Sequence, residues 1–132
     1  EWKGQSETNK ILKSSFNSIK VDGLCVRIGT MRSHSQALTI KLKKSIPIEI
    51  INEIIANGNQ WVKLIPNEKE SSISLLSPAE VSGKLEIAVG RIRKLDIEKN
   101  CISVFTVGDQ LLWGAAEPIR RMLKILIKKG SS

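Results

Sequence analysis

The chain has 132 residues, of which 41% are hydrophobic and 26% charged, a composition typical of one globular domain or a large piece of one. No apolar run approaches the ~20 residues of a membrane-spanning helix, so no transmembrane span is expected within these residues. The formal net charge is +8 and aromatic residues make up only 4%, which favours anionic substrates over a nucleic-acid partner, because stacking surfaces for bases are scarce.

The first part of the chain alternates loops and strands. Residues 1–20 are polar, and Lys13–Ser18 is expected to be a loop. Leu24–Ile28 follows the turn pair Asp22-Gly23 and is predicted to be a strand. Gln36–Lys43 alternates between apolar and polar residues, which predicts a half-buried strand with a basic outer face.

A helix and a short strand follow. Pro47 suits a first helical position, and isoleucines then recur every three or four residues until Gly58, which predicts an amphipathic helix of about three turns. Trp61–Ile65 is typical of another short strand. The apolar face of the helix is expected to comprise Ile46, Ile50, Ile51, Ile54 and Ile55.

The next segment predicts a capped helical turn and a hairpin. Ser77–Glu80 has the form of a capping box, and Gly83 follows so closely that only a single turn fits. In the strand that follows, alternate side chains are expected to lie on one face: Leu85, Ile87, Val89, Arg91 and Arg93. Its predicted antiparallel partner carries Ile102, Val104 and Thr106, beyond the polar turn 96–100.

A long helix closes the chain. Asp109 is expected to cap it, and the helix should run to about Lys129. The ring of Pro118 presses on the carbonyl of Gly114, so we expect a kinked rather than a broken helix. The pattern as a whole predicts a mixed α/β (α+β) fold: a mixed, largely antiparallel sheet with helices on one face. The closing helix carries one apolar stripe: Leu111, Leu112, Ala115, Ala116, Ile119, Met122, Leu123 and Leu126.

Cysteine usage and the chain's opening bear on its context. Cys25 and Cys101 match no Cys-x-x-Cys spacing and are expected to be small apolar residues in a reducing compartment, with one disulfide as the alternative. One His and two scattered Cys cannot form a tetrahedral ligand set, so no metal site is predicted. The chain opens on Glu1 without an initiator Met or a signal peptide, so we expect a piece of a longer, cytoplasmic protein.

Two residues stand out as candidates for chemistry. His34, the only histidine, lies between two strand patterns, where it can be a general base or a surface or structural residue. Arg27 interrupts an apolar strand pattern, so it needs an anionic partner, either a ligand or an internal carboxylate in an ion pair. No Gly-x-Gly-x-x-Gly, P-loop or Gly-x-Ser-x-Gly pattern accompanies them.

Read as strings, the segments closely resemble bacterial aspartate-semialdehyde dehydrogenases. The resemblance covers nearly all of the chain, in order and at near-constant spacing. It implies the C-terminal portion of that enzyme, with the sheet fold of the C-terminal domain of glyceraldehyde-3-phosphate-dehydrogenase-like proteins. The segments that carry it are Glu1–Leu12 (EWKG-x-x-ETNKIL), Val21–Gly29 (VDGLCVR-x-G), Arg32–Ala37 (R-x-HSQA), Gly90–Leu95 and Phe105–Pro118.

The resemblance also implies a reaction. The family reduces L-aspartyl-4-phosphate with NADPH to aspartate 4-semialdehyde and inorganic phosphate, in the biosynthesis of lysine (through diaminopimelate), threonine and methionine. Its members are homodimers. Residues 1–108 would belong to the catalytic and dimerisation domain, and residues 109–132 would form a closing helix that packs on a dinucleotide-binding domain outside this chain.

Four residues match positions with roles in the family. His34 matches the acid/base histidine, Arg27 the arginine that clamps the substrate carboxylate, and Lys3 the lysine that binds phosphate. Gln110 matches a residue that contacts NADP.

The family's nucleophile lies in a Gly-Asn-Cys-Thr setting that neither Cys25 nor Cys101 has, and a substrate-binding glutamate would precede Glu1. The resemblance therefore implies a piece that is inactive alone. The alternative reading is a basic module for binding polyanions or for oligomerisation.

Overall fold

The computed structural model describes residues 3–14 and 19–130, and residues 15–18 of the expected loop Lys13–Ser18 lie outside them. Four strands form one sheet in the order β1-β4-β3-β2, with β1–β4 and β4–β3 antiparallel and β3–β2 parallel. This mixed, largely antiparallel sheet with helices confirms the expected fold class. The strands are β1 (His34–Lys41), β2 (Val62–Leu64), β3 (Ile87–Lys94) and β4 (Cys101–Gly108).

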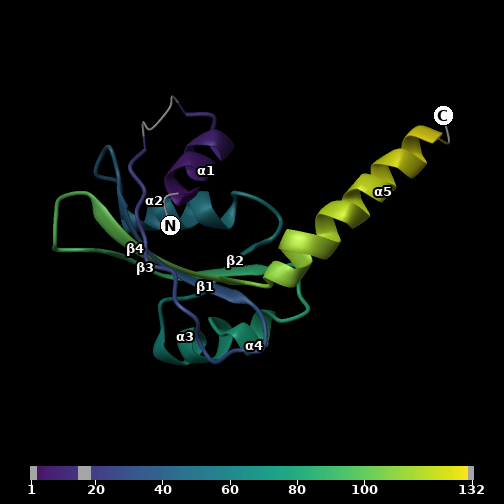
Figure 1. Cartoon of the computed structure of the whole chain (residues 1–132). Helices are drawn as coiled ribbons and strands as arrows, with labels where there is room; N and C mark the ends of the chain where they lie inside the picture. The colour runs from purple at the N-terminus through teal and green to yellow at the C-terminus, as the bar shows by residue number, and fades with distance from the viewer. Residues whose placement is uncertain (1–2, 15–18, 131–132) are drawn as a thin grey trace.

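Helices lie on both sides of the sheet, not on one as the sequence predicted (Figure 1). On one side are α1 (Lys3–Ile11) and α2 (Ile48–Ala56), and on the other are α3 (Lys69–Leu75) and α4 (Pro78–Val81). The reason is that the central strands β3 and β4 carry apolar side chains on both faces, and each face has to be covered.

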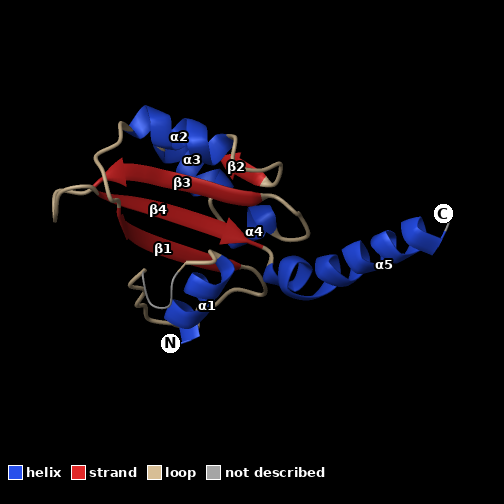
Figure 2. Cartoon of the chain, turned by 90° about the horizontal axis from the view of Figure 1, so that it is seen from above, coloured by secondary structure: helices blue, strands red, loops and turns tan. Residues whose placement is uncertain are grey.

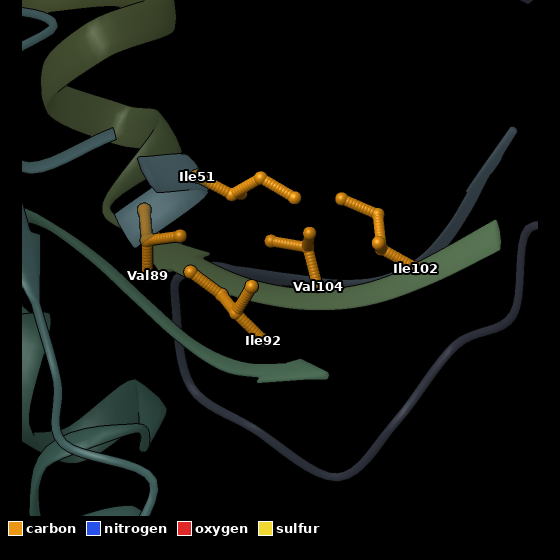
Figure 3. Packing of buried hydrophobic residues seen from close by; sticks show 5 residues of the cluster. All are labelled: Ile51, Val89, Ile92, Ile102 and Val104. Atoms are coloured by element: carbon orange, nitrogen blue, oxygen red, sulfur yellow. The ribbon is translucent and has the colours of Figure 1, made fainter. Parts of the chain in front are cut away.

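Two apolar clusters make up the core, one on each face. On the α2 side, Ile51 points from the helix toward the side chains of β3 and β4 (Figure 3). The cluster comprises Ile51, Val89, Ile92, Ile102 and Val104. On the α3–α4 side, the cluster comprises Ile65, Leu76, Val81, Ala88 and Val107.

Helix α2 confirms the isoleucine pattern only in part. Ile51 is buried and Ile55 packs against the same cluster, but Ile50 and Ile54 are 44% and 60% exposed. Ile48, which the prediction left out, also packs there, because residues 48, 51 and 55 share one face of the helix. Pro47 lies one position earlier than expected, at the N-cap.

The predicted strand Leu24–Ile28 does not form, and its apolar side chains are mostly exposed: Leu24 by 81%, Val26 by 69% and Ile28 by 58%. A run of apolar residues becomes a strand only where a neighbour pairs with it, and among the described residues no strand pairs with this one. The polar residues before it form a helix, α1, which no apolar periodicity could indicate.

The predicted hairpin forms as β3 and β4, but a bulge changes one face of β3. Gly90 pairs with Phe105 and Arg93 with Ser103, so Arg91 and Ile92 together stand opposite one residue of β4. Ile92 therefore follows Val89 into the core, whereas Arg91, with φ 53°, and Arg93 are exposed. The expectation that Arg91 and Arg93 continue the Val89 face is wrong.

The two predicted caps are confirmed. Ser77 caps α4, its Oγ accepting a hydrogen bond from the Glu80 N–H at 3.2 Å, and α4 is a single turn. Asp109 caps the closing helix. Helix α3, between β2 and α4, was not predicted.

The closing helix begins at Gln110, passes through the π-helical turn η1 (Leu112–Ala116) and continues as α5 (Glu117–Gly130). The π turn ends two residues before Pro118, and the helix continues through the proline, so it is distorted but not broken, as expected. Helix α5 projects away from the sheet (Figure 2). None of the helices within the described residues is long and apolar enough to cross a membrane.

Candidate active site

His34 is the first residue of β1, opposite Gly108 at the end of β4, and its side chain is exposed. By strand alternation it shares a face with Leu38 and Ile40, which lie opposite the core residues Val104 and Ile102. That is the face on which α1 and α2 lie (Figure 1). His34 thus lies at the end of the sheet, on the same face as the helix that begins with Lys3.

The residue before His34 is held in an uncommon conformation. Ser33 has φ 80° and is 4% exposed. Its N–H donates to Gln110 Oε1 at 3.0 Å, and its Oγ lies 3.2 Å from Ser82 Oγ and 3.4 Å from the carbonyl oxygen of Pro78. These contacts tie the start of β1 both to the closing helix and to α4.

Asp109 is the buried centre of this region. Its Oδ2 accepts from the Gly83 N–H at 2.7 Å and its Oδ1 from the Leu111 N–H at 3.0 Å, and Arg32 forms an ion pair with it. Burial by itself would raise the pKa of Asp109, but the Gly83 N–H, the Arg32 guanidinium and the Leu112 N–H together hold this pKa below its usual value. The carboxylate is therefore charged at neutral pH.

Arg27 lies in the exposed segment before this turn. Within residues 3–14 and 19–130 it forms no ion pair, so the internal carboxylate partner that the sequence allowed is not found. The segment turns back just after it, where the Thr30 N–H donates to the Ile28 carbonyl at 2.8 Å and Thr30 Oγ1 donates to the Arg32 carbonyl at 2.9 Å. The Arg27 side chain is exposed to solvent.

Lys3 begins α1 and is exposed. Helix α1 is tied to the chain that leads to Arg27 through Asn9, which is 4% exposed. The Asn9 Nδ2 donates to the Ile19 carbonyl at 2.9 Å, and its Oδ1 accepts from the Ile19 N–H at 3.0 Å. One amide thereby pairs with both backbone groups of Ile19, which fixes the position of α1 relative to the Arg27 segment.

The structure brings these four residues together to different degrees. Gln110 contacts the backbone beside His34 directly. The side chains of Lys3, Arg27 and His34 share no hydrogen bond among the described residues, and are related through α1, the Arg27 segment and the turn at Ser33.

The two cysteines do not form a disulfide: Cys25 is exposed and Cys101 is buried. Cys101 pairs with Lys41, at the opposite end of β1 from His34, so its thiol cannot act together with that imidazole. Within the described residues, no three His, Cys, Asp or Glu side chains are grouped so that they could hold a metal ion.

Sequence reasoning missed the contacts that hold the site. Asn9 and Arg32 belong to segments that resemble the family, but no role was predicted for either, and Asp109 was predicted only as a helix cap. The sequence held one indication of the Arg32 contact. Asp109 stands directly before Gln110, and a charged capping residue that becomes buried favours a cationic partner. Nothing in the sequence indicated the positive φ of Ser33.

Comparison with known proteins identifies the family. The profile described as "Semialdehyde dehydrogenase, dimerisation domain" matches residues 1–113. The chain belongs to this family.

Two solved structures show the same fold. The aspartate semialdehyde dehydrogenase from Francisella tularensis superposes with a TM-score of 0.89 at 52% identity, over 96% of this chain and 34% of that one. The aspartate semialdehyde dehydrogenase II from Vibrio cholerae gives a TM-score of 0.75 at 23% identity, over 97% of this chain and 36% of that one, and so shows the fold alone. The semialdehyde dehydrogenase dimerisation domain described here thus spans about a third of the length of these relatives.

Proposed function

We propose that this chain is the substrate-binding and dimerising part of an NADP-dependent aspartate-semialdehyde dehydrogenase. The observation that carries the proposal is the 52% identity, over 96% of the chain, to the Francisella tularensis enzyme of that name. The reaction converts L-aspartyl-4-phosphate, NADPH and a proton into aspartate 4-semialdehyde, inorganic phosphate and NADP. It lies in the biosynthesis of lysine, threonine and methionine, in the cytoplasm.

The three exposed groups divide the work on an anionic substrate. His34 exchanges a proton with the oxygen of the tetrahedral intermediate, a role that an exposed imidazole at a rigid sheet end can fill. Arg27 holds the α-carboxylate with its two-pronged guanidinium, and Lys3 neutralises the phosphate as a point charge.

When bound in its reduced form, NADPH, the cofactor would supply the hydride. Gln110 fits a contact with it, because only its Oε1 is used, by the Ser33 N–H, and no partner of its Nε2 is found among the described residues. That amide can donate a hydrogen bond to the cofactor. Gln110 is thereby proposed to connect the cofactor to the turn that carries His34.

The remaining chemistry is assigned to the part of the enzyme for which this chain has no counterpart. Cys101 is at the wrong end of β1 to be the nucleophile, and Cys25 lacks the setting of the family's reactive cysteine. We therefore expect the chain alone to be inactive and the enzyme to work as a homodimer.

The test is a chimaera in which this chain replaces the matching third of the Francisella tularensis enzyme. Activity is measured by formation of reduced nicotinamide from aspartate semialdehyde, phosphate and NADP. We expect kcat/KM within about tenfold of the parent, and a fall of about a hundred- to ten-thousandfold in kcat for His34→Ala. A dimeric chimaera that is inactive, or unaffected by His34→Ala, would contradict the proposal.

A further inference from the structure

The turn that delivers His34 to the sheet is strained and yet firmly held. Ser33 has φ 80°, in the left-handed region that a residue with a Cβ adopts only at a cost in free energy. Such a conformation persists when surrounding contacts impose it. Because Ser33 directly precedes His34, its backbone angles set the direction in which the imidazole leaves the sheet.

The contacts that impose this conformation converge on the first two residues of the closing helix. Gln110 accepts the Ser33 N–H at 3.0 Å, and Asp109 pairs with Arg32, the residue just before Ser33. The Arg32 Nε is buried and has no hydrogen-bond partner among the described residues, so the charge of this guanidinium is compensated there by Asp109.

The Asp109 carboxylate makes contacts beyond those of a helix cap. It is completely buried, and besides the helix amides it accepts the Gly83 N–H at 2.7 Å from the end of α4. A cap needs one oxygen, which here is Oδ1, facing Leu111 and Leu112. The second oxygen is directed to Gly83 and Arg32, and so fixes the α4 end and the turn before His34 relative to the helix.

We propose that Asp109 is a positioning residue for His34, acting through Arg32, with Gln110 as a second tie through the Ser33 N–H. The inference rests on the proposed acid/base role of His34. It assigns to the start of the closing helix a task in the reaction: to fix the direction of the imidazole relative to the substrate. A displacement of about 1 Å at a reacting group can cost on the order of a hundredfold in rate.

The discriminating variant is Asp109→Asn in the chimaera. Asparagine keeps an oxygen for the helix cap but presents a neutral amide to Arg32. We expect kcat to fall about 10- to 100-fold with KM changed by less than about threefold, and no further fall when Asp109→Asn is added to His34→Ala. A merely structural role predicts the same fractional loss in both backgrounds. Equal losses, or an unchanged kcat, would overturn the inference.

Two variants of Arg32 test the same contact if the Asp109→Asn protein does not fold. Arg32 is partly exposed, so Arg32→Gln should fold and reproduce the loss in kcat, and Arg32→Lys should restore part of it, because an ammonium can still pair with Asp109. Asn57→Ala is the matched control: it removes a hydrogen bond at the end of α2, from Asn57 Nδ2 to the Glu53 carbonyl at 2.9 Å, which takes no part in the contacts of Asp109 or Ser33, and it should leave kcat unchanged.

A measurement on this chain itself separates the inference from the proposed function. His34 is its only histidine, so the ring signals in a proton NMR spectrum belong to one residue. Arg32→Gln should shift these signals and speed amide exchange at Ser33, whereas Asn57→Ala should not. Shifted ring signals with a fully active His34→Ala chimaera would refute the catalytic role but retain the positioning contact. Unshifted signals would refute the positioning contact itself.

Discussion

At the scale of residues, one buried carboxylate lies at the start of the closing helix and a second lies within it, and the first connects the helix to the turn before β1. Asp109 pairs with Arg32, and Glu117, which is 4% exposed, pairs with Arg120 and Arg121. The Arg121 guanidinium carbon lies 4.2 Å from the ring centre of Trp61, a position suited to a cation–π interaction. The sequence predicted the Asp109 cap because capping depends on local spacing. It could not predict that Arg32 pairs with Asp109, because that contact depends on how distant segments meet.

The first residue-scale prediction concerns acid. The Arg120 and Arg121 guanidinium groups lower the pKa of Glu117 from its usual 4.5 to about 2. Since the folded pKa is below the unfolded one, this stabilisation is fully present above about pH 4.5 and is lost as the pH falls toward 2. Glu117→Gln should therefore flatten the fall in melting temperature between about pH 6 and pH 3.

Glu80→Gln is the control for this acid dependence. Lys84 also lowers the pKa of Glu80, but the Glu80 side chain is 35% exposed, so solvent weakens the pair. The melting curve of this variant should keep nearly the whole acid dependence. If the melting temperature of Glu117→Gln falls as steeply with pH as that of the parent, Glu117 is not the cause of the acid dependence.

The second residue-scale prediction concerns Arg27. If the guanidinium clamps a carboxylate through two parallel hydrogen bonds, lysine can replace its charge but not its geometry. Arg27→Lys in the chimaera should raise KM for aspartate semialdehyde about tenfold or more while kcat changes little. Arg93→Lys, on the hairpin far along the sheet, is the matched control. Steady-state kinetics equal to the parent's would remove Arg27 from the substrate site.

At the scale of elements, the sequence predicted the structures that have local causes. The isoleucine helix, the hairpin and the Ser77 cap follow from periodicity and capping, and all three form. The expected strand Leu24–Ile28 does not form, because pairing is decided by neighbouring strands and not by an apolar run and a preceding turn alone. The bulge at Arg91 was missed for a similar reason, since it is created by the register of the hairpin.

The element-scale prediction concerns the packing of α3 and β2 on β3. A Cβ added to Gly90 would lie 2.7 Å from Leu76 Cδ1 and 3.2 Å from Ile65 Cβ, so Gly90→Ala would overpack this layer. We expect it to lower the free energy of unfolding by about 1–3 kcal/mol. In Gly108→Ala the nearest contact would be an ordinary 3.5 Å to Ile87, so that variant should change stability little. Equal urea midpoints for the two variants would contradict the close approach.

At the scale of the whole molecule, residues 1–113 match the dimerisation-domain profile and α5 extends beyond them. Helix α5 projects from the rest of the structure beside a cluster of Trp61, Trp113 and Arg121. The two indole rings in this cluster pack edge to face, with 5.2 Å between their centres. The division expected from the sequence, with a closing helix from residue 109 that packs on another domain, stays a proposal. It is supported by the apolar side chains that α5 exposes.

The last prediction tests what that exposed face does. Ile119, Met122, Leu123 and Leu126 are spaced as one helical stripe and are 56–71% exposed. Leu123→Lys with Leu126→Lys should therefore reduce concentration-dependent association of the chain in sedimentation velocity. Its melting temperature should stay nearly the same, because these side chains bury little area. Ile73→Lys, equally exposed at 70% on α3, should leave association unchanged. If the double variant associates like the parent, the contact between chains lies within residues 1–113 and not on α5.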